Sequence, residues 1–280
     1  MVTSPTTSRL HPNPPLETFP EVKMTTTFTV EIYSDTLCPF CYIGKKSLDS
    51  AISLYQSRHP DVSFKLIWRP FLIHPKFRGK VPNKRDYFKA KYGAAQAEGL
   101  FKRLEERGRR LGIDFSWDGA SGSSWDSHKL ILAAGDRDRL EEEEKAAGRE
   151  EEEREGGWGG RQKAMLDGLF RGVFEEGRDV SDHQFLAEVA VNAGVVETVE
   201  EAERVMADEE MGRRVEWESA QGRKREIEAV PSYLVQGRYF VGGMQEPEVF
   251  EEVFGRVVRG KESGRVAARE GEVCHWAEKA

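Results

Sequence analysis

Cysteine is scarce in this sequence, with only three in 280 residues. Three cysteines cannot form the disulfide framework of a small secreted protein, so a closely spaced pair predicts a reducing compartment and either redox chemistry or metal binding. The sequence also lacks any run of about 18 apolar residues, the length that a membrane-spanning helix needs. Positive charge is not in excess, because the formal net charge is −7, which argues against nucleic acid or an anionic membrane as the main partner.

Residues 1–26 are rich in Pro, Ser and Thr and lack the apolar stretch of a secretory signal. We expect a disordered leader and a cytoplasmic protein. A mitochondrial presequence is the alternative, since it would also be rich in Ser and poor in acids. The four prolines from Pro5 to Pro15 oppose the amphipathic helix that import requires.

Residues 27–78 contain the pattern of a βαβ unit. Apolar residues alternate with polar ones in TFTVEIY and again in SFKLIWRPF, which is typical of two strands. Between them, Leu48, Ile52 and Tyr55 recur at helical spacing and predict a helix from Cys38 to about Ser57.

Two of the three cysteines lie at the start of this helix, in Cys38-Pro39-Phe40-Cys41. Pro39 suits the first helical position, which makes Cys38 the N-cap residue. The positive end of the helix dipole would then lower the pKa of the Cys38 thiol, so Cys38 is the predicted nucleophile, partly exposed. Cys41 follows at a Cα separation of roughly 5 Å and is the predicted resolving thiol.

Two other interpretations of the pair are weaker. A structural zinc ion needs four ligands, and the one remaining cysteine, Cys274, lies beside His275 in a polar segment near the end of the chain. No metal site is therefore expected. Two chance buried thiols would not explain Pro39 or the flanking strand and helix.

Residues 226–262 predict a ββα unit. The runs Ser232–Val235 and 238–241 flank a Gln-Gly turn, and Pro247 begins a helix with apolar residues at 249, 250, 253, 254, 257 and 258. A βαβ unit at one end and a ββα unit at the other predict an α/β protein with a thioredoxin fold. Pro231, after Val230, stands where that fold has its cis peptide bond.

Residues 79–225 predict a large α-helical insertion between these halves. Apolar residues recur at helical spacing around Leu130, Met165 and Phe185. Residues 139–161 are rich in Glu and then in Gly, which is typical of a solvated helix or disorder. Residues 263–280 predict a polar tail.

The segments SDTLCPFCYIGKK, WRPFLIHP, LFRGVFEEGRDVSD and AVPSYLVQGRYFVGGMQEPEVF resemble the DsbA-like thioredoxin-fold oxidoreductases. The similarity is to the FrnE-type branch, which is related to 2-hydroxychromene-2-carboxylate isomerases and kappa-class glutathione transferases. The resemblance implies that Cys38 and Cys41 are the catalytic pair and that the helical insertion lies over the active-site face. It also implies a substrate site formed by Val230, Pro231, Pro39, Phe40, Trp125 and His128.

Two comparisons with branches of the family are informative. The isomerase and transferase branches typically have serine where this chain has Cys38, so the retained pair favours dithiol chemistry. The periplasmic oxidants of the family have Pro-His between the cysteines, and without that imidazole the Pro-Phe centre of this chain should be a milder oxidant. His74 and His128 are candidate bases, although a buried or surface histidine without a catalytic role is the simpler interpretation.

Three functions remain open. The first is a thiol-disulfide oxidoreductase without a bound cofactor, acting on a disulfide-containing protein or a small thiol, with glutathione as a candidate co-substrate. The second is a glutathione-dependent isomerase or transferase for a small electrophile. The third is a redox sensor or scaffold that holds a partner.

Overall fold

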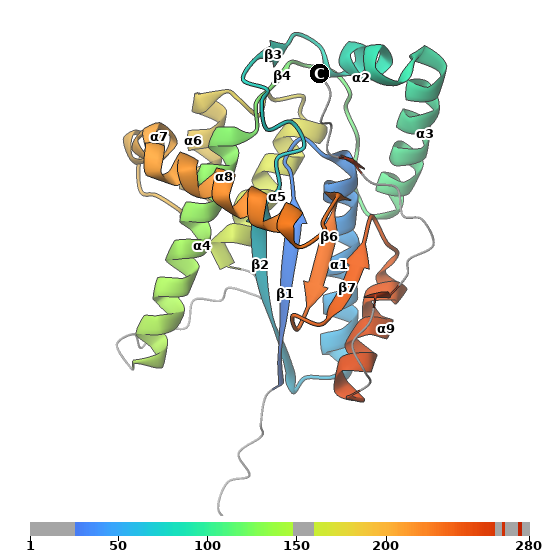
Figure 1. Ribbon diagram of the computed structural model, residues 1–280, viewed down its shortest axis with the longest axis vertical. Helices are drawn as coiled ribbons and strands as arrows, with labels where there is room; N and C mark the ends of the chain where they lie inside the picture. The colour runs from blue at the N-terminus through green and yellow to red at the C-terminus, as the bar shows by residue number, and fades with distance from the viewer. Residues whose placement is uncertain (1–25, 148–159, 261–264, 267–273, 276–280) are drawn as a thin grey trace, which may run out of the picture.

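The computed structural model describes residues 26–147, 160–260, 265–266 and 274–275. Its centre is a five-stranded mixed sheet with the order β2-β1-β6-β7-β8 (Figure 1). Strands β1 (Thr26–Ser34) and β2 (Val62–Pro70) run parallel and are connected by helix α1 (Pro39–Arg58). The predicted βαβ unit is therefore confirmed.

The C-terminal half supplies the rest of the sheet. Strand β6 (Ser232–Val235) runs antiparallel to β1 and to β7 (Tyr239–Gly242), and helix α9 (Pro247–Val258) follows. The turn of the hairpin contains Gln236 and Gly237 with φ of 53° and 62°, a left-handed conformation that suits glycine. The protein thus has the predicted thioredoxin fold with a helical insertion.

Helices α1 and α9 pack together on one face of the sheet. The ring of Phe28 in β1 lies 6.0 Å from Tyr55 of α1, 5.2 Å from Phe64 of β2 and 5.8 Å from Phe254 of α9, measured between ring centroids. These aromatic contacts add to the apolar area that the alternating strand residues bury. The same alternation in the sequence predicted this face.

The insertion consists mainly of helices. They are α2 (Lys84–Tyr92), α3 (Ala94–Arg110), α4 (Trp125–Ala146), α5 (Gly160–Phe174), α6 (His183–Asn192), α7 (Val199–Ala207) and α8 (Glu209–Lys224). A short antiparallel pair, β3 (Lys80–Val81) with β4 (Ser121–Gly122), was not predicted. Helix α8 crosses in front of β1 and β2, on the face opposite α1 (Figure 1).

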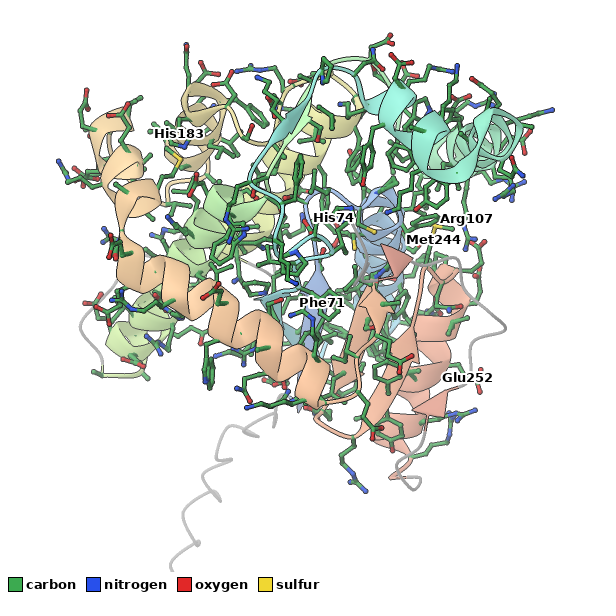
Figure 2. All side chains as sticks on the ribbon, turned by 45° about the horizontal axis from the view of Figure 1, so that its top comes forward. Phe71, His74, Arg107, His183, Met244 and Glu252 are labelled. Carbon is green, nitrogen blue, oxygen red and sulfur yellow. The ribbon has the colours of Figure 1, made fainter. Side chains whose placement is uncertain are left out.

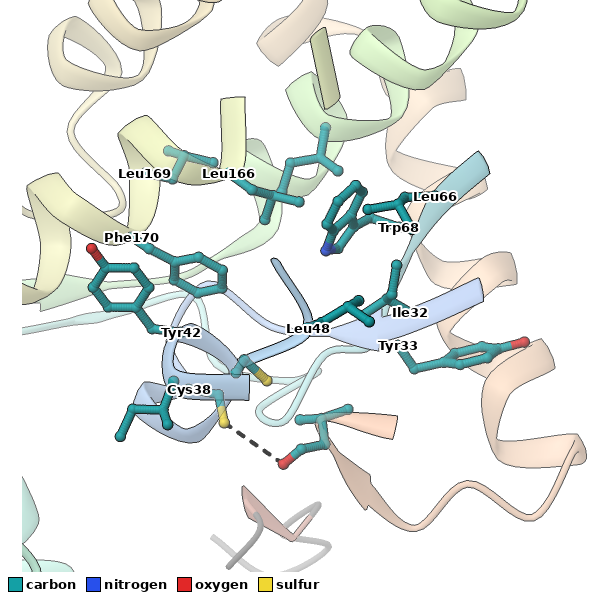
Figure 3. Packing of buried hydrophobic residues seen from close by; sticks show 14 of the residues in the cluster. Ile32, Tyr33, Cys38, Tyr42, Leu48, Leu66, Trp68, Leu166, Leu169 and Phe170 are labelled. Atoms are coloured by element: carbon teal, nitrogen blue, oxygen red, sulfur yellow. Dashed lines mark hydrogen bonds between the residues drawn. The ribbon is translucent and has the colours of Figure 1, made fainter. Parts of the chain in front are cut away.

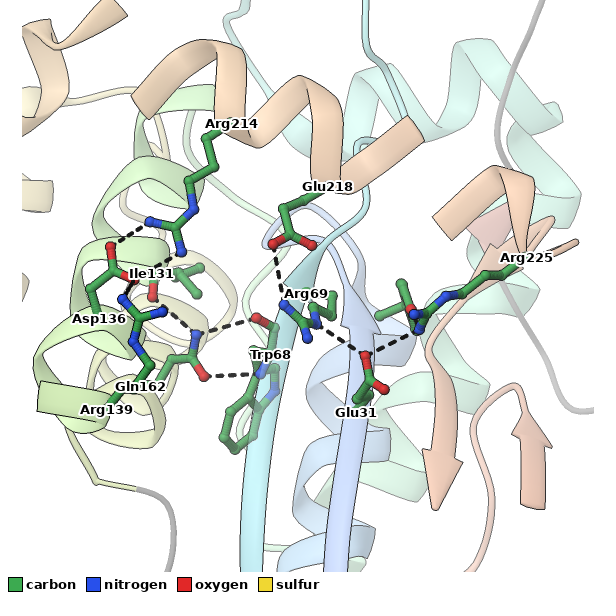
Figure 4. Close-up of polar contacts among 11 residues, drawn as sticks. Glu31, Trp68, Arg69, Ile131, Asp136, Arg139, Gln162, Arg214, Glu218 and Arg225 are labelled. Atoms are coloured by element: carbon green, nitrogen blue, oxygen red, sulfur yellow. Dashed lines mark hydrogen bonds and ion pairs between the residues drawn. The ribbon is translucent and has the colours of Figure 1, made fainter. Parts of the chain in front are cut away.

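Polar contacts attach the insertion to the outer strand β2 (Figure 4). The side chain of Gln162 in α5 accepts from the backbone N–H of Trp68 at 2.9 Å and donates to the Trp68 carbonyl at 3.2 Å. It also donates to the carbonyl of Ile131 in α4 at 3.1 Å. Arg69 of β2 bridges Glu31 of β1 and Glu218 of α8. The Gln162 bonds satisfy the backbone N–H and C=O of Trp68 at the outer edge of β2 from within the chain.

Two details differ from the sequence-based expectation, at Val258 and after Gly260. Val258, assigned to the apolar stripe of α9, is 61% exposed because the helix ends there. The acidic segment 139–161 begins as the last turns of α4, while 148–159 lie outside the described residues, as does the leader up to residue 25. The predicted polar tail contains two short strands, β8 (Arg265–Val266) and β9 (Cys274–His275).

Candidate active site

The turn between β1 and α1 is fixed by the buried side chain of Asp35. Its carboxylate accepts from the backbone N–H of Leu37 at 3.1 Å and from that of Ile73 at 2.8 Å. The N–H of Cys38 donates to the Asp35 carbonyl at 3.1 Å, and Cys38 has φ −99° and ψ 109°. This extended conformation is that of an N-cap residue, with Pro39 in the first helical turn as predicted.

The two cysteines lie one helical turn apart at the start of α1. The N–H of Cys41 donates to the Cys38 carbonyl at 3.0 Å. The expectation that Cys38 is partly exposed is wrong, because Cys38 is 0% and Cys41 2% exposed. The Cys38 side chain makes no capping hydrogen bond to the helix N–H groups. The lowered thiol pKa that the helix terminus suggested therefore stays a prediction.

The loop before β6 lies against the cysteine pair. The Val230-Pro231 peptide bond is cis, as predicted from the sequence. The Cys38 sulfur donates to the Val230 carbonyl at 3.7 Å, the contact drawn as a dashed line in Figure 3. Val230 belongs to the short strand β5 (Ala229–Val230), so this contact joins the N-terminal dithiol to the C-terminal half of the fold.

Tyr233 is a residue of the site that the sequence analysis missed. Its side chain is 0% exposed, and its hydroxyl makes no hydrogen bond within the part of the chain that the structure describes. Burial raises the pKa of Tyr233 well above its ordinary value, and negative charge on Cys41 and Cys38 raises it further. The hydroxyl therefore stays protonated beside the thiols. No sequence signal marks it, since its position follows from the pairing of β6 with β1.

Asp35 also contacts His128, which the resemblance assigned to the substrate site. Nε2 of His128 lies 3.5 Å from Oδ1 of Asp35, and both side chains are buried. Burial alone would raise the pKa of Asp35, but the His128 imidazole and the N–H groups of Ile73 and Leu37 outweigh it and hold the pKa below its ordinary value. His128 thus lies beside the turn that carries Cys38.

Trp125, the other insertion residue assigned to the site, lies in a different environment. It packs against the small apolar cluster of Leu72, Leu132 and Val215. The guanidinium of Arg78 lies 3.9 Å from the centre of its ring. Pro39 and Phe40, between the cysteines, are both buried. Roles in substrate binding for these three residues stay predictions.

A largely apolar cavity of about 260 Å³ opens between the insertion and the start of α1. Leu37, next to Cys38, lines it together with Phe88 of α2 and Phe174 of α5. Lys84 also lines it, and burial lowers the pKa of this lysine to about 8.

His74 lines the same cavity, and its Nε2 lies 3.0 Å from the hydroxyl of Tyr87. Burial lowers the pKa of His74, and the charge of Lys91 lowers it further. In Figure 2, His74 lies near the middle of the molecule, whereas His183 is at the edge of the insertion. His74 is therefore a neutral cavity residue at pH 7.

No helix within the described ranges is both long and apolar enough to cross a bilayer. Among solved structures, a probable DsbA oxidoreductase from Streptomyces coelicolor matches with a TM-score of 0.68 and 26% identity, over 87% of this chain and 97% of the other. A 2-hydroxychromene-2-carboxylate isomerase matches with a TM-score of 0.54 and 14% identity, over 83% and 97% of the two chains.

The cytosolic disulfide reductase DsbM from Pseudomonas aeruginosa matches with a TM-score of 0.50 and 16% identity, over 83% of this chain and 100% of the other. At such low identity the isomerase and the reductase show the shared fold only. No curated protein matches the chain. The DSBA-like thioredoxin domain matches residues 29–148 and 153–255, most of the sequence, and the chain therefore belongs to that family.

Proposed function

We propose that the protein is a thiol-disulfide oxidoreductase in which Cys38 attacks and Cys41 resolves. One observation carries the proposal: Cys38 is the N-cap of α1, one turn before Cys41, and its sulfur lies 3.7 Å from the Val230 carbonyl beside Pro231. A partner that pairs with the Val230 backbone would therefore bring a disulfide next to the attacking sulfur.

The chemistry is two successive thiol-disulfide exchanges. The Cys38 thiolate attacks one sulfur of the partner disulfide, forming a mixed disulfide, and the other partner sulfur leaves as a thiolate that takes a proton from water. Cys41, deprotonated, then attacks the Cys38 sulfur. This closes the Cys38–Cys41 disulfide and releases the first partner sulfur. The partner is reduced by two electrons and the protein is oxidised by two.

Two molecules of glutathione, or one molecule of a dithiol, would return the protein to its reduced form and would themselves be oxidised to a disulfide; a reducing compartment such as the cytosol would supply them. An extended segment of a disulfide-containing protein would pair with the Val230 backbone in place of β9, which pairs there within the chain. The apolar cavity lined by Leu37 and Phe88 would accept a neighbouring apolar side chain. The helical insertion then contributes to the specificity of the exchange.

The test is to equilibrate the full chain in glutathione buffers of graded ratio, alkylate it and map its disulfides by mass spectrometry. We expect one reversible Cys38–Cys41 disulfide. Cys38→Ser should abolish reduction of a peptide disulfide, because the serine hydroxyl is a poor nucleophile at neutral pH. Urea unfolding of the variant would show that its fold is intact. A folded Cys38→Ser variant that reduces the peptide at the wild-type rate would overturn the proposal.

A glutathione-dependent isomerase or transferase is the second candidate, and the apolar cavity beside Leu37 favours it. A cavity of about 260 Å³ suits a small aromatic electrophile better than it suits a folded protein. In that reaction Cys41 has no role. Turnover of such an electrophile that Cys41→Ser leaves unchanged, with no reversible disulfide, would favour this candidate over the exchange reaction.

A further inference from the structure

The short strand β9 lies at the edge where a peptide substrate would bind. It pairs antiparallel with β5, with Cys274 opposite Val230 and His275 opposite Ala229. The preceding strand β8 runs parallel to β7, with Val266 opposite Val241. Two separate pairings therefore place β8 and β9 against strands of the C-terminal half of the thioredoxin fold (Figure 1).

β5 and β9 form a two-stranded sheet of their own. An extended peptide that adds to the Val230 backbone needs the same N–H and C=O groups. Cys274 and His275 therefore occupy, within the chain itself, the position that the proposed function assigns to the partner. Any external peptide has to displace β9 first.

The register also places a cysteine near the nucleophile. Directly opposed residues of an antiparallel pair have Cα atoms roughly 4.5–5.5 Å apart. The carbonyl of Val230, opposite Cys274, contacts the Cys38 sulfur at 3.7 Å. The backbone of Cys274 thus lies one strand spacing from Val230, the residue whose carbonyl contacts the attacking sulfur.

We infer that the strand Cys274–His275 is an internal substrate of the active site, in which the third cysteine exchanges with Cys38. The inference rests on the proposed function. It accounts for the third cysteine of the chain, which neither attack nor resolution uses. It also gives a role to the pairing of β9 with β5, the strand whose Val230 carbonyl contacts the buried Cys38.

The exchange needs no oxidant other than the disulfide that the partner supplies. In a mixed disulfide between Cys38 and a partner, the Cys274 thiolate attacks the Cys38 sulfur, the Cys38–Cys274 bond forms, and the partner sulfur leaves as a thiolate that is protonated by water. Cys41 can then attack Cys38 and release Cys274 as a thiol. In either route the protein ends with a Cys38–Cys41 disulfide and the partner ends reduced.

The experiment compares two full-length variants, Cys41→Ser and Cys41→Ser/Cys274→Ser, incubated with oxidised glutathione, quenched in acid, digested and mapped by mass spectrometry. We expect a Cys38–Cys274 peptide in the first variant and glutathione on Cys38 in the second. Because a tethered thiol acts at an effective concentration in the millimolar range, glutathione on Cys38 should be roughly tenfold lower in the first variant.

Equal glutathione on Cys38 in both variants, without a Cys38–Cys274 peptide, would overturn the inference and leave the proposed function standing. No glutathione on Cys38 in either variant would overturn the proposed function itself. Cys38→Ser is the matched control, in which a Cys41–Cys274 peptide should be absent. Formation of that peptide at a similar level, or loss of the Cys38–Cys274 peptide on dilution of the protein, would show unspecific or intermolecular exchange and overturn the inference.

Discussion

Gly44 of α1 lies directly against Tyr233 of β6, because a β-carbon placed on residue 44 would come within 2.2 Å of the Tyr233 hydroxyl oxygen and 3.0 Å of Pro231 Cγ. The absence of a side chain at Gly44 is thus what lets the loop of Val230 and Pro231 approach the helix that carries both cysteines. The contact links the two halves of the thioredoxin fold one helical turn after Cys41.

Gly44→Ala should therefore destabilise the protein, on the order of 1–3 kcal/mol, because it overpacks a buried contact. Urea unfolding measures the change in the free energy of unfolding. Disulfide exchange should also slow, since the added methyl group moves Pro231 away from the cysteines.

Tyr233→Phe provides a matched rescue. It removes the oxygen that the new methyl group meets, while the ring carbon Cζ lies at 3.5 Å, an ordinary contact. We expect Gly44→Ala/Tyr233→Phe to recover most of the lost stability. Equal stability of Gly44→Ala and the double variant would show that the hydroxyl is not the source of the strain.

A second prediction concerns Gln162, whose buried amide makes three hydrogen bonds to the backbone at Trp68 and Ile131. Gln162→Leu leaves these backbone groups without that partner, so we expect a loss on the order of 2–4 kcal/mol in the free energy of unfolding. Gln184→Leu, at an exposed position of α6, is the control and should cost far less. Similar losses in both variants would rule out a special role for the Gln162 bridge.

Residue patterns in the sequence predicted the scaffold of the site better than its surroundings. Alternating apolar residues such as Phe28, Val30 and Ile32 indicate a strand that is buried on one face, so the strands of the βαβ unit follow from local sequence. Pro39 indicates the start of a helix, and the N-cap position of Cys38 follows from it. The cis bond before Pro231 followed from the thioredoxin fold that the βαβ and ββα units indicate. Both kinds of signal lie within a short segment of the chain.

Contacts between distant segments could not be predicted in this way. Asp35 meets His128, and Val230 meets Cys274, only because the fold brings together residues far apart in the sequence. The burial of Cys38 likewise depends on elements that pack around it after folding. No periodicity within α1 encodes that burial, which is why partial exposure was the wrong expectation.

The third prediction concerns Asp35 and acid stability. Asp35→Asn replaces one of two accepting carboxylate oxygens by an NH₂ group, which cannot accept from the N–H of Ile73 or Leu37. Hydrogen bonds to a charged group are stronger than average, so we expect a loss on the order of 2 kcal/mol at pH 7.

This loss should shrink as the pH falls. The pKa of Asp35 is lowered in the folded protein, so its stabilising effect is complete above the ordinary aspartate pKa of about 3.9 and disappears as the pH falls through the folded value. Urea unfolding at a series of pH values below 5 gives the difference between wild type and variant. Asp61→Asn, at an exposed position, is the control. A difference that does not change with pH would contradict the assignment.

The last prediction concerns Lys84, whose amino group donates to the carbonyl of Val173 and lines the apolar cavity. Burial lowers the pKa of Lys84 from 10.5 to about 8. Below pH 8 the lysine is charged in both the folded and the unfolded chain. Between the two pKa values the unfolded chain binds more protons, so this group makes the folded state more stable as the pH rises.

Lys84→Met removes that contribution. We therefore expect the free energy of unfolding of the wild type, relative to the variant, to increase from pH 8 toward pH 10.5, with urea unfolding as the measurement. Lys102→Met replaces an exposed lysine of α3 and controls for the loss of one positive charge. Tyrosines and cysteines also titrate in this range, but both proteins carry them, so their effect on the free energy of unfolding cancels in the difference. A constant difference between wild type and Lys84→Met across this range would mean that the amino group reaches water despite its burial, and the cavity would then be a polar site rather than an apolar one.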